Sequence, residues 1–376
     1  MMTERRTLAD GKQWLLERLE RGLHPLDGLD PDRVRATIAA LAGLEPAPWT
    51  QAWGALADEF VTEAIAAGDD RGAAAAAWMN AYRASFVGRY PVPHDPLKAR
   101  AYDRAREYFL NATAYDEPPL EAVTLPFHDR PDRDGRDRLS FYLTKPARDE
   151  ASRKPLPVVM VWAGIDTWKE EMHERLGAFL RSRGFAVLLI DMPGVGESPV
   201  YAGPDGERQW TPIFDWIDAR DDLDADRVAA VGGSFGGYWA MKLAYTHRER
   251  LRCAVNWGGG VHITFTRDWQ ERSRNSSSYL MDLMRARAGV FGGETFDDYV
   301  ASCSGLSLLD QGLLEQPCAP LLLTNGRDDV QNSIDDVYLS LDHGDPKTVR
   351  VFDGGHMGEG PVVPTIVAWV AGQLAR

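Results

Sequence analysis

A serine with glycine two positions away on each side is the strongest chemical signal in the sequence. Residues 232–236 read Gly-Gly-Ser-Phe-Gly and fit the pattern Gly-x-Ser-x-Gly. Glycines at those two positions permit a very sharp turn that exposes the serine hydroxyl. The pattern alone is weak evidence, but here an apolar strand pattern precedes it and a helical pattern follows it. The sequence therefore predicts that Ser234 is a nucleophile that attacks an acyl carbon.

A serine hydroxyl needs a base to take its proton, and an acid to orient that base. His356 lies in a Gly-rich loop between the last expected strand and the closing helix, which is a suitable place for the base. The acid should end the preceding strand, where residues 326–330 supply Asp329, with Asp328 as the alternative. The chain order serine, acid, histidine thus predicts a triad of Ser234, Asp329 and His356.

Two backbone N–H groups are needed to bind the negative oxygen that develops when an acyl carbon is attacked. We expect the first from Phe235, and the second from Ile165 or Gly164 in the turn after the strand at 158–162. Four further residues near strand ends are candidates for contacting substrate: His262, Trp257, Trp168 and Tyr238. A structural role explains His262 equally well. Two later carboxylates, Asp335 and Asp336, are interpreted as lying on a helix face.

Composition argues against several functions. A net charge of −14 makes nucleic acid an unsuitable partner, and the absence of an 18-residue apolar run argues against a membrane span. Three cysteines and an N-terminus without the apolar middle of a secretory signal favour a reducing cytoplasm. No metal-ligand spacing or phosphate-binding loop is evident, so we expect no metal and no cofactor. The expected partner is a small-molecule substrate.

The hydrophobic period changes near residue 116 and divides the chain of 376 residues in two. Residues 1–115 read as helices, with Asp30-Pro31 and Thr50 as helix starts, and are expected to cap the pocket or to form a homodimer contact. Residues 116–376 read as the catalytic domain. Strands are expected at 120–127, 138–144, 158–162, 186–191, 227–232, 253–257, 320–325 and 348–352.

The alternation of apolar strands with helices predicts an α/β fold, in which a mainly parallel sheet is covered on both faces. The first two strands should pair in antiparallel fashion at its edge. About 60 residues separate the strands at 253–257 and 320–325, far more than an ordinary crossover needs. We therefore expect a helical lid insertion at about residues 262–311.

Several segments together resemble one branch of the α/β hydrolases, which includes 2,6-dihydroxypseudooxynicotine hydrolase, fungal hydrolases that shorten polyketide chains, and FrsA-like esterases. The segments are Ala163-Gly-Ile-Asp-Thr-Trp-Lys-Glu-Glu171, Asp191-Met-Pro-Gly-Val-Gly-Glu197, Gly233-Ser-Phe-Gly-Gly-Tyr-Trp-Ala240, Asn256-Trp-Gly-Gly259 and Gly354-Gly-His356. The resemblance implies an α/β-hydrolase fold with a helical N-terminal segment. Some of these relatives carry an extra carboxylate after the Asn-Trp-Gly-Gly segment, where this chain offers His262 or Asp268.

The expected activity is that of a serine hydrolase working through an acyl-enzyme. The resemblance implies as substrate either a carboxyl ester or a ketone C–C bond of the 1,3-dicarbonyl or acyl-phenol type, in an aromatic or polyketide-like molecule. Two alternatives remain open. One is an acyltransferase that uses the same triad, and the other is a non-catalytic ligand-binding protein on a hydrolase scaffold.

Overall fold

The computed structural model describes residues 6–133, 135–147, 154–274, 279–343, 345 and 347–375. The chain divides into two units, one comprising Met1–Leu120 with Ser277–Ala286 and the other Glu121–Ser276 with Arg287–Arg376. The first unit thus combines the N-terminal helices with a short piece of the long connection between two strands. In the described ranges no helix is long and apolar enough to cross a membrane.

The first unit is helical, as its sequence pattern predicts. Its helices are α1 (Leu8–Glu20), α2 (Pro31–Ala40), α3 (Pro46–Ala66), α4 (Arg71–Arg89) and α5 (Pro96–Thr113). The carboxylate of Asp30 begins α2 by accepting from the backbone N–H groups of Asp32 and Arg33. Aromatic side chains fill the space between the helices, with Tyr82 in ring contact with Phe86 and Phe109.

The prediction that Thr50 begins a helix is wrong. Helix α3 already starts at Pro46, and Thr50 lies inside its first turns, where its hydroxyl donates to the Pro46 carbonyl at 2.7 Å. Proline at the first helical position supplies a φ angle suited to a helix and lacks an N–H that would need a partner. That local preference decides the start of α3 without a side-chain cap.

The second unit is built on one eight-stranded sheet with the order β1-β2-β4-β3-β5-β6-β7-β8. The strands are β1 (Glu121–Pro126), β2 (Arg138–Thr144), β3 (Leu156–Trp162), β4 (Ala186–Ile190), β5 (Leu223–Gly233), β6 (Cys253–Trp257), β7 (Leu321–Gly326) and β8 (Thr348–Phe352). Strand β2 pairs antiparallel with β1 and with β4, whereas all other pairs are parallel. The sheet is therefore mainly parallel with an antiparallel edge, as expected.

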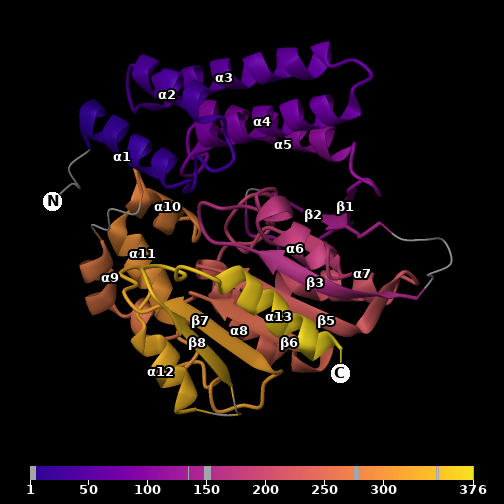
Figure 1. Cartoon of the computed structure of the whole chain (residues 1–376). Helices are drawn as coiled ribbons and strands as arrows, with labels where there is room; N and C mark the ends of the chain where they lie inside the picture. Colours follow the sequence, from indigo (N-terminus) through magenta and orange to yellow (C-terminus); the bar gives the residue numbers. More distant parts are fainter. Residues whose placement is uncertain are drawn as a thin grey trace. The chain divides into compact units, whose positions relative to one another are not determined.

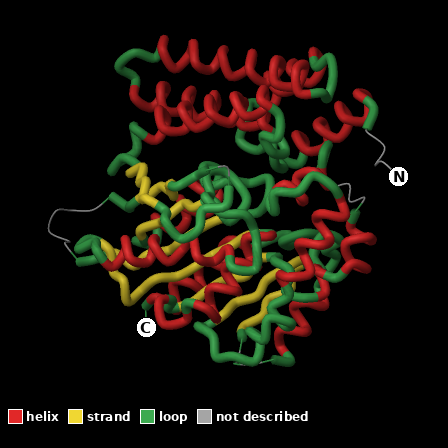
Figure 2. Tube along the Cα trace, turned by 180° about the vertical axis from the view of Figure 1, so that it is seen from behind, coloured by secondary structure: helices red, strands yellow, loops and turns green. Residues whose placement is uncertain are grey.

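Helices cover both faces of this sheet (Figures 1 and 2). They include α6 (Ala178–Arg181), α7 (Thr211–Asp218), α8 (Phe235–Thr246), α12 (Asp335–Leu341) and α13 (Val362–Leu374). Helix α13 crosses one face, and α8 packs on the other (Figure 1). Every residue of β4 is buried, as a strand covered on both sides should be, whereas edge strand β8 alternates between exposed and partly exposed residues and buries only its last residue, Phe352.

The connection from β6 to β7 is helical, as predicted. It contains α9 (Arg267–Ser273), α10 (Leu283–Gly289) and α11 (Phe296–Cys303). The connection from β3 to β4 contains a π-helical turn at His173–Gly177 followed by the short α6. Lys169 and Glu170, which precede this turn, are buried and form an ion pair.

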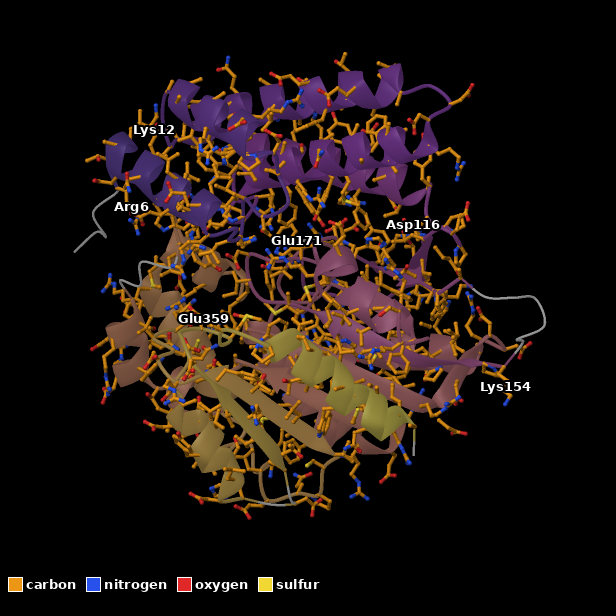
Figure 3. All side chains as sticks on the ribbon, viewed as in Figure 1. Arg6, Lys12, Asp116, Lys154, Glu171 and Glu359 are labelled. Atoms are coloured by element: carbon orange, nitrogen blue, oxygen red, sulfur yellow. The ribbon has the colours of Figure 1, made fainter. Side chains whose placement is uncertain are left out.

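The carboxyl ends of the parallel strands share one edge of the sheet. Lys154 precedes β3 and Glu359 follows β8, and these residues lie at opposite ends of the sheet (Figure 3). In open parallel sheets, ligands bind beyond the carboxyl ends of the strands. The turns after β3, β4, β5, β6, β7 and β8 are therefore the segments that can build a site.

Candidate active site

Ser234 lies in a sharp turn between β5 and α8. Its backbone has φ 54° and ψ −130°, a conformation that residues with a side chain rarely adopt. A Cβ atom on Gly232 would overlap the carbonyl of Gly236, and one on Gly236 would overlap the carbonyl of Ala163. Both glycines of the motif are therefore required by close backbone approach, and the serine side chain is directed out of the turn.

The three residues of the predicted triad form one line of hydrogen bonds. His356 Nε2 lies 2.7 Å from Ser234 Oγ, and His356 Nδ1 lies 2.8 Å from Asp329 Oδ2. An ionised carboxylate can only accept, so Nδ1 carries the proton and Nε2 is left to accept from the serine hydroxyl. This is the tautomer that a general base needs.

The surroundings of Asp329 keep its carboxylate ionised. Burial alone would raise its pKa, but the charge and hydrogen bond of His356, with further hydrogen bonds from Asn325 and the Gln331 amide, lower the pKa below its usual value. Asp328, the alternative acid, is exposed to solvent. The structure thus brings Asp329, and not Asp328, to the histidine.

Asn325 is a site residue that the sequence did not reveal. It is 2% exposed at the end of β7, and its amide Nδ2 donates to Asp329 Oδ2 at 2.9 Å. Its Oδ1 accepts from the backbone N–H of Met357 at 3.1 Å and from that of Gly326 at 2.8 Å. One side chain therefore holds both the acid and the loop that carries His356. The only sequence signal is an amide residue at the end of an apolar strand.

We expect Asn325→Asp to shift the acidic limb of the pH–rate profile upward by about one pH unit. The substitution keeps the acceptor oxygen and replaces only the donor, so a second carboxylate oxygen faces Asp329 Oδ2 across the present 2.9 Å contact. Additional negative charge there favours the protonated imidazole, which cannot act as a base. The check is kcat/KM measured from pH 5 to 9, and an unchanged acidic limb would contradict this role.

The two segments that carry the expected oxyanion donors meet at Ser234. Phe235 is the first residue of α8, and N–H groups in the first turn of a helix have no partner inside it. The turn after β3 touches the serine, because a Cβ on Gly164 would lie 2.8 Å from Ser234 Cβ. Ile165 follows directly, and its carbonyl accepts from the Trp168 indole N–H at 2.8 Å. Phe235 and Ile165 thus lie on segments that meet at Ser234.

Trp257 supports the site through its backbone and its ring. Its carbonyl accepts from the Ser234 N–H at 2.8 Å, and its indole N–H donates to the Met357 carbonyl at 2.7 Å. Met357, next to His356, has a positive φ of 69°. Trp257 therefore connects the turn of the nucleophile to the loop of the histidine, and it stays partly exposed.

Two aromatic residues expected to contact substrate are buried inside the second unit. Tyr238 is 0% exposed on α8, and its hydroxyl accepts from Gln311 at 3.4 Å. Trp168 is 3% exposed and holds its own loop through Ile165. Aromatic side chains beside a site commonly belong to the core, and a local sequence pattern does not separate the two cases.

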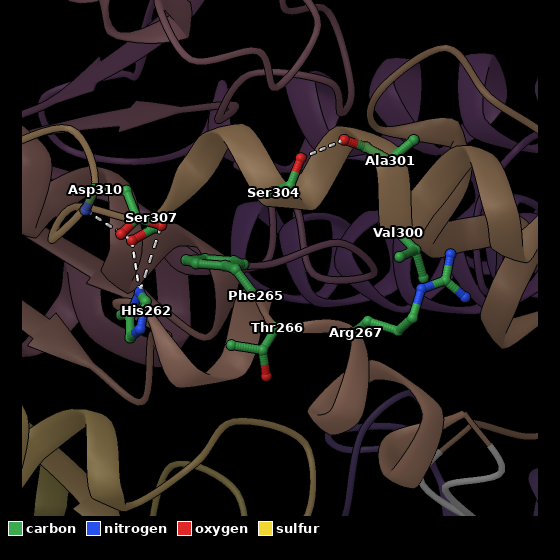
Figure 4. Close-up of a pocket in the computed structure, with 9 residues that line it drawn as sticks. All are labelled: His262, Phe265, Thr266, Arg267, Val300, Ala301, Ser304, Ser307 and Asp310. Atoms are coloured by element: carbon green, nitrogen blue, oxygen red, sulfur yellow. Dashed lines mark hydrogen bonds and ion pairs between the residues drawn. The ribbon is translucent and has the colours of Figure 1, made fainter.

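His262 lies at one end of a cavity of about 370 Å³, with Arg267 at the other end (Figure 4). Its Nδ1 lies 2.7 Å from Ser307 Oγ and 3.8 Å from Asp310. The described residues that line this cavity include none of the triad. The structure therefore gives His262 local polar partners and does not bring it to Ser234. Asp268 is exposed on α9.

Asp335 and Asp336 lie on helix α12, as interpreted, but Asp336 points into the protein interior. Asp336 is 0% exposed, and its carboxylate accepts from four backbone N–H groups in the turn after β6, those of residues 261–264. The side chain thus fixes the start of the long connection. Among the described residues, no group of three or more His, Cys, Asp or Glu side chains could hold a metal ion.

Comparison with known proteins agrees with this architecture. The chain is 22% identical to the crystal structure of 2,6-dihydroxy-pseudo-oxynicotine hydrolase, with a TM-score of 0.72 over 90% of this chain and 92% of the other. It is 20% identical to AbyA5, with a TM-score of 0.71 over 98% and 99% of the two chains. At this level of identity, the likeness shows the fold, and it is the α/β-hydrolase fold.

Sequence comparison identifies the family. Esterase FrsA of Yersinia pestis (strain Pestoides F) is 27% identical over 256 residues, which are 68% of this chain and 59% of that relative's length. Esterase FrsA of Yersinia pseudotuberculosis serotype O:1b (strain IP 31758) matches to the same extent. The family model "Esterase FrsA-like" matches residues 35–348, which is most of the chain. This protein therefore belongs to the FrsA-like esterase family.

Proposed function

We propose that this protein is a serine hydrolase that cleaves carboxyl esters of small molecules through an acyl-enzyme. The observation that carries the proposal is the continuous line of hydrogen bonds from Ser234 through His356 to Asp329. The family to which the chain belongs supports the ester as the substrate class. Hydrolysis of an acyl C–C bond would use the same acyl-enzyme, and the experiment below separates the two.

The reaction follows from the geometry. His356 Nε2, at 2.7 Å, takes the proton of Ser234 as Oγ bonds to the acyl carbon. The electrons of the C=O bond move to oxygen, which the N–H groups of Phe235 and Ile165 stabilise. Collapse breaks the bond to the leaving alkoxide, which receives the proton from His356. A water then repeats these steps on the acyl-enzyme and releases the acid, restoring Ser234.

A fluorophosphonate probe and a substrate screen test this proposal. We expect the probe to label Ser234 of the folded protein, and we expect Ser234→Ala to abolish labelling and hydrolysis of p-nitrophenyl esters. Ser307→Ala is a matched control, because Ser307 also lies 2.7 Å from a histidine nitrogen but not on a sharp strand–helix turn. Folded protein that the probe leaves unlabelled would contradict the proposal.

The screen should include p-nitrophenyl esters of increasing acyl length and aromatic 1,3-diketones. Turnover of diketones with weak ester turnover would move the assignment from ester to C–C bond hydrolysis. Product analysis with an added alcohol or amine would reveal acyl transfer, the alternative use of the same intermediate. The role of the first unit as a cap or a homodimer contact stays a prediction, and the mass of the protein in solution tests its dimer form.

A further inference from the structure

A lysine is completely buried next to the loop that approaches the nucleophile. Lys169 is 0% exposed, and its Nζ lies 2.7 Å from Asp191, 2.9 Å from Glu197 and 3.2 Å from Glu170. Lys169 and Asp191 belong to two of the segments that carry the family resemblance, residues 163–171 and 191–197. The reaction proposed above uses no side chain of this cluster.

Lys169 forms ion pairs with three carboxylates, and the one with Asp191 is the shortest. Burial raises the pKa of Glu170; Lys169 lowers it, and nearby Asp191 and Glu197 raise it again, so the net shift is upward. Burial would also raise the pKa of Asp191, but the charge of Lys169 and hydrogen bonds from Lys169 and the Glu197 amide lower it below its usual value. The Tyr142 hydroxyl donates to Glu170 at 3.2 Å. The contact between Lys169 and Asp191 is thus the shortest of the three and fully buried, whereas Glu197 is the most exposed of the three carboxylates.

Lys169 binds Asp191 through both its backbone and its side chain. The backbone N–H of Lys169 donates to Asp191 Oδ1 at 3.1 Å, and its Nζ donates to Asp191 Oδ2. The turn after β4 encloses the carboxylate from the other side, since the Glu197 N–H donates to it at 2.9 Å. A Cβ on Gly196, whose φ is 47°, would overlap it. Asp191 is therefore a fixed anchor for the loop.

The other end of the same loop lies against the nucleophile. A Cβ on Gly164 would lie 2.9 Å from Ser234 Oγ, and Ile165, the expected second oxyanion donor, follows Gly164. Trp168, the residue before Lys169, donates its indole N–H to the Ile165 carbonyl at 2.8 Å. The fixed positions of residues 168 and 169 are thus transmitted to the backbone at residue 165.

We propose that Lys169 is a positioning residue, whose ion pair with Asp191 holds the Ile165 N–H in place to bind the oxyanion. The inference rests on the proposed hydrolase function and adds to it a residue that acts through the loop. A buried ion pair is a poor source of stability compared with apolar packing. It does give a fixed geometry, and oxyanion stabilisation depends on donors placed within a few tenths of an ångström.

The test is Lys169→Met, which keeps the unbranched side chain up to the position of Cε and removes the charged Nζ. With p-nitrophenyl butyrate, we expect kcat to fall by about 10- to 100-fold while KM changes by less than about threefold. Phenylboronic acid mimics the tetrahedral adduct at Ser234, so its Ki should rise by the same factor as kcat falls. Lys145→Met is the matched control, because it removes an ion pair with Asp222, at 3.1 Å, at the other end of the sheet.

Asp191→Asn keeps the shape of the anchor and covers the case in which Lys169→Met does not fold. We expect this variant to lower kcat by about tenfold while leaving KM nearly unchanged. Folded variants with kcat and boronate Ki both within twofold of the parent would overturn the inference. Absence of fluorophosphonate labelling in the parent protein would instead refute the hydrolase function itself, so the two failures are distinguishable.

Discussion

Replacing His356 with alanine is expected to lower kcat for ester hydrolysis by about 10⁶-fold. The His356 Nε2 atom lies 2.7 Å from Ser234 Oγ. Among the described residues it is the only nitrogen in hydrogen-bond contact with this hydroxyl that can take its proton. Without it the hydroxyl stays protonated during attack, and the leaving group receives no proton. Reaction with a fluorophosphonate should be lost in parallel, because it also needs an activated serine.

Initial rates with p-nitrophenyl butyrate and probe labelling measure this effect. His343→Ala is the matched control, since His343 also pairs with a carboxylate, that of Glu315, but lies in a surface turn. We expect the control to keep its rate and its labelling. Activity of His356→Ala above about 1% of the parent would be incompatible with a general base at this position.

The residues of the expected triad could be picked out because a nucleophile, an acid and a base would need particular places along the chain. Ser234 needs glycines at 232 and 236 for steric reasons, and these appear in the local sequence. Asp329 and His356 follow the ends of two strands whose apolar runs are easily recognised, and parallel strands bring such ends together. Local pattern and fold topology therefore gave the same positions.

The supporting residues were not predictable, because their environment depends on contacts between distant segments. Asn325, Lys169 and Asp336 are polar residues that the sequence alone would leave on the surface. Asp336, for example, is buried by backbone N–H groups that lie more than 70 residues earlier in the chain. The burial of Tyr238 and Trp168 was not predictable for the same reason, since a local pattern does not show which aromatic side chains the core will cover.

Replacing Asp329 with asparagine is expected to lower kcat by about 10⁴-fold, although the two side chains have nearly the same shape. Four donors surround the present carboxylate: His356 Nδ1 and Asn325 Nδ2 at Oδ2, and the N–H groups of Gln331 and Asn332 at Oδ1. An amide has one oxygen and one NH₂ group, so either orientation turns a donor toward donors. If the NH₂ faces His356, Nδ1 must give up its proton and Nε2 must carry one, which is the wrong tautomer for a base.

The adjacent Asp328→Asn variant is the matched control for this prediction. It makes the same chemical change one residue earlier, on a side chain that is exposed, and should leave kcat within about twofold. Initial-rate assays of both variants measure the loss of catalysis, and thermal melts measure any loss of stability. We expect the misplaced buried amide to lower the free energy of unfolding by about 1–3 kcal/mol. Equal effects of the two substitutions would contradict the assignment, because only Asp329 accepts a hydrogen bond from the histidine.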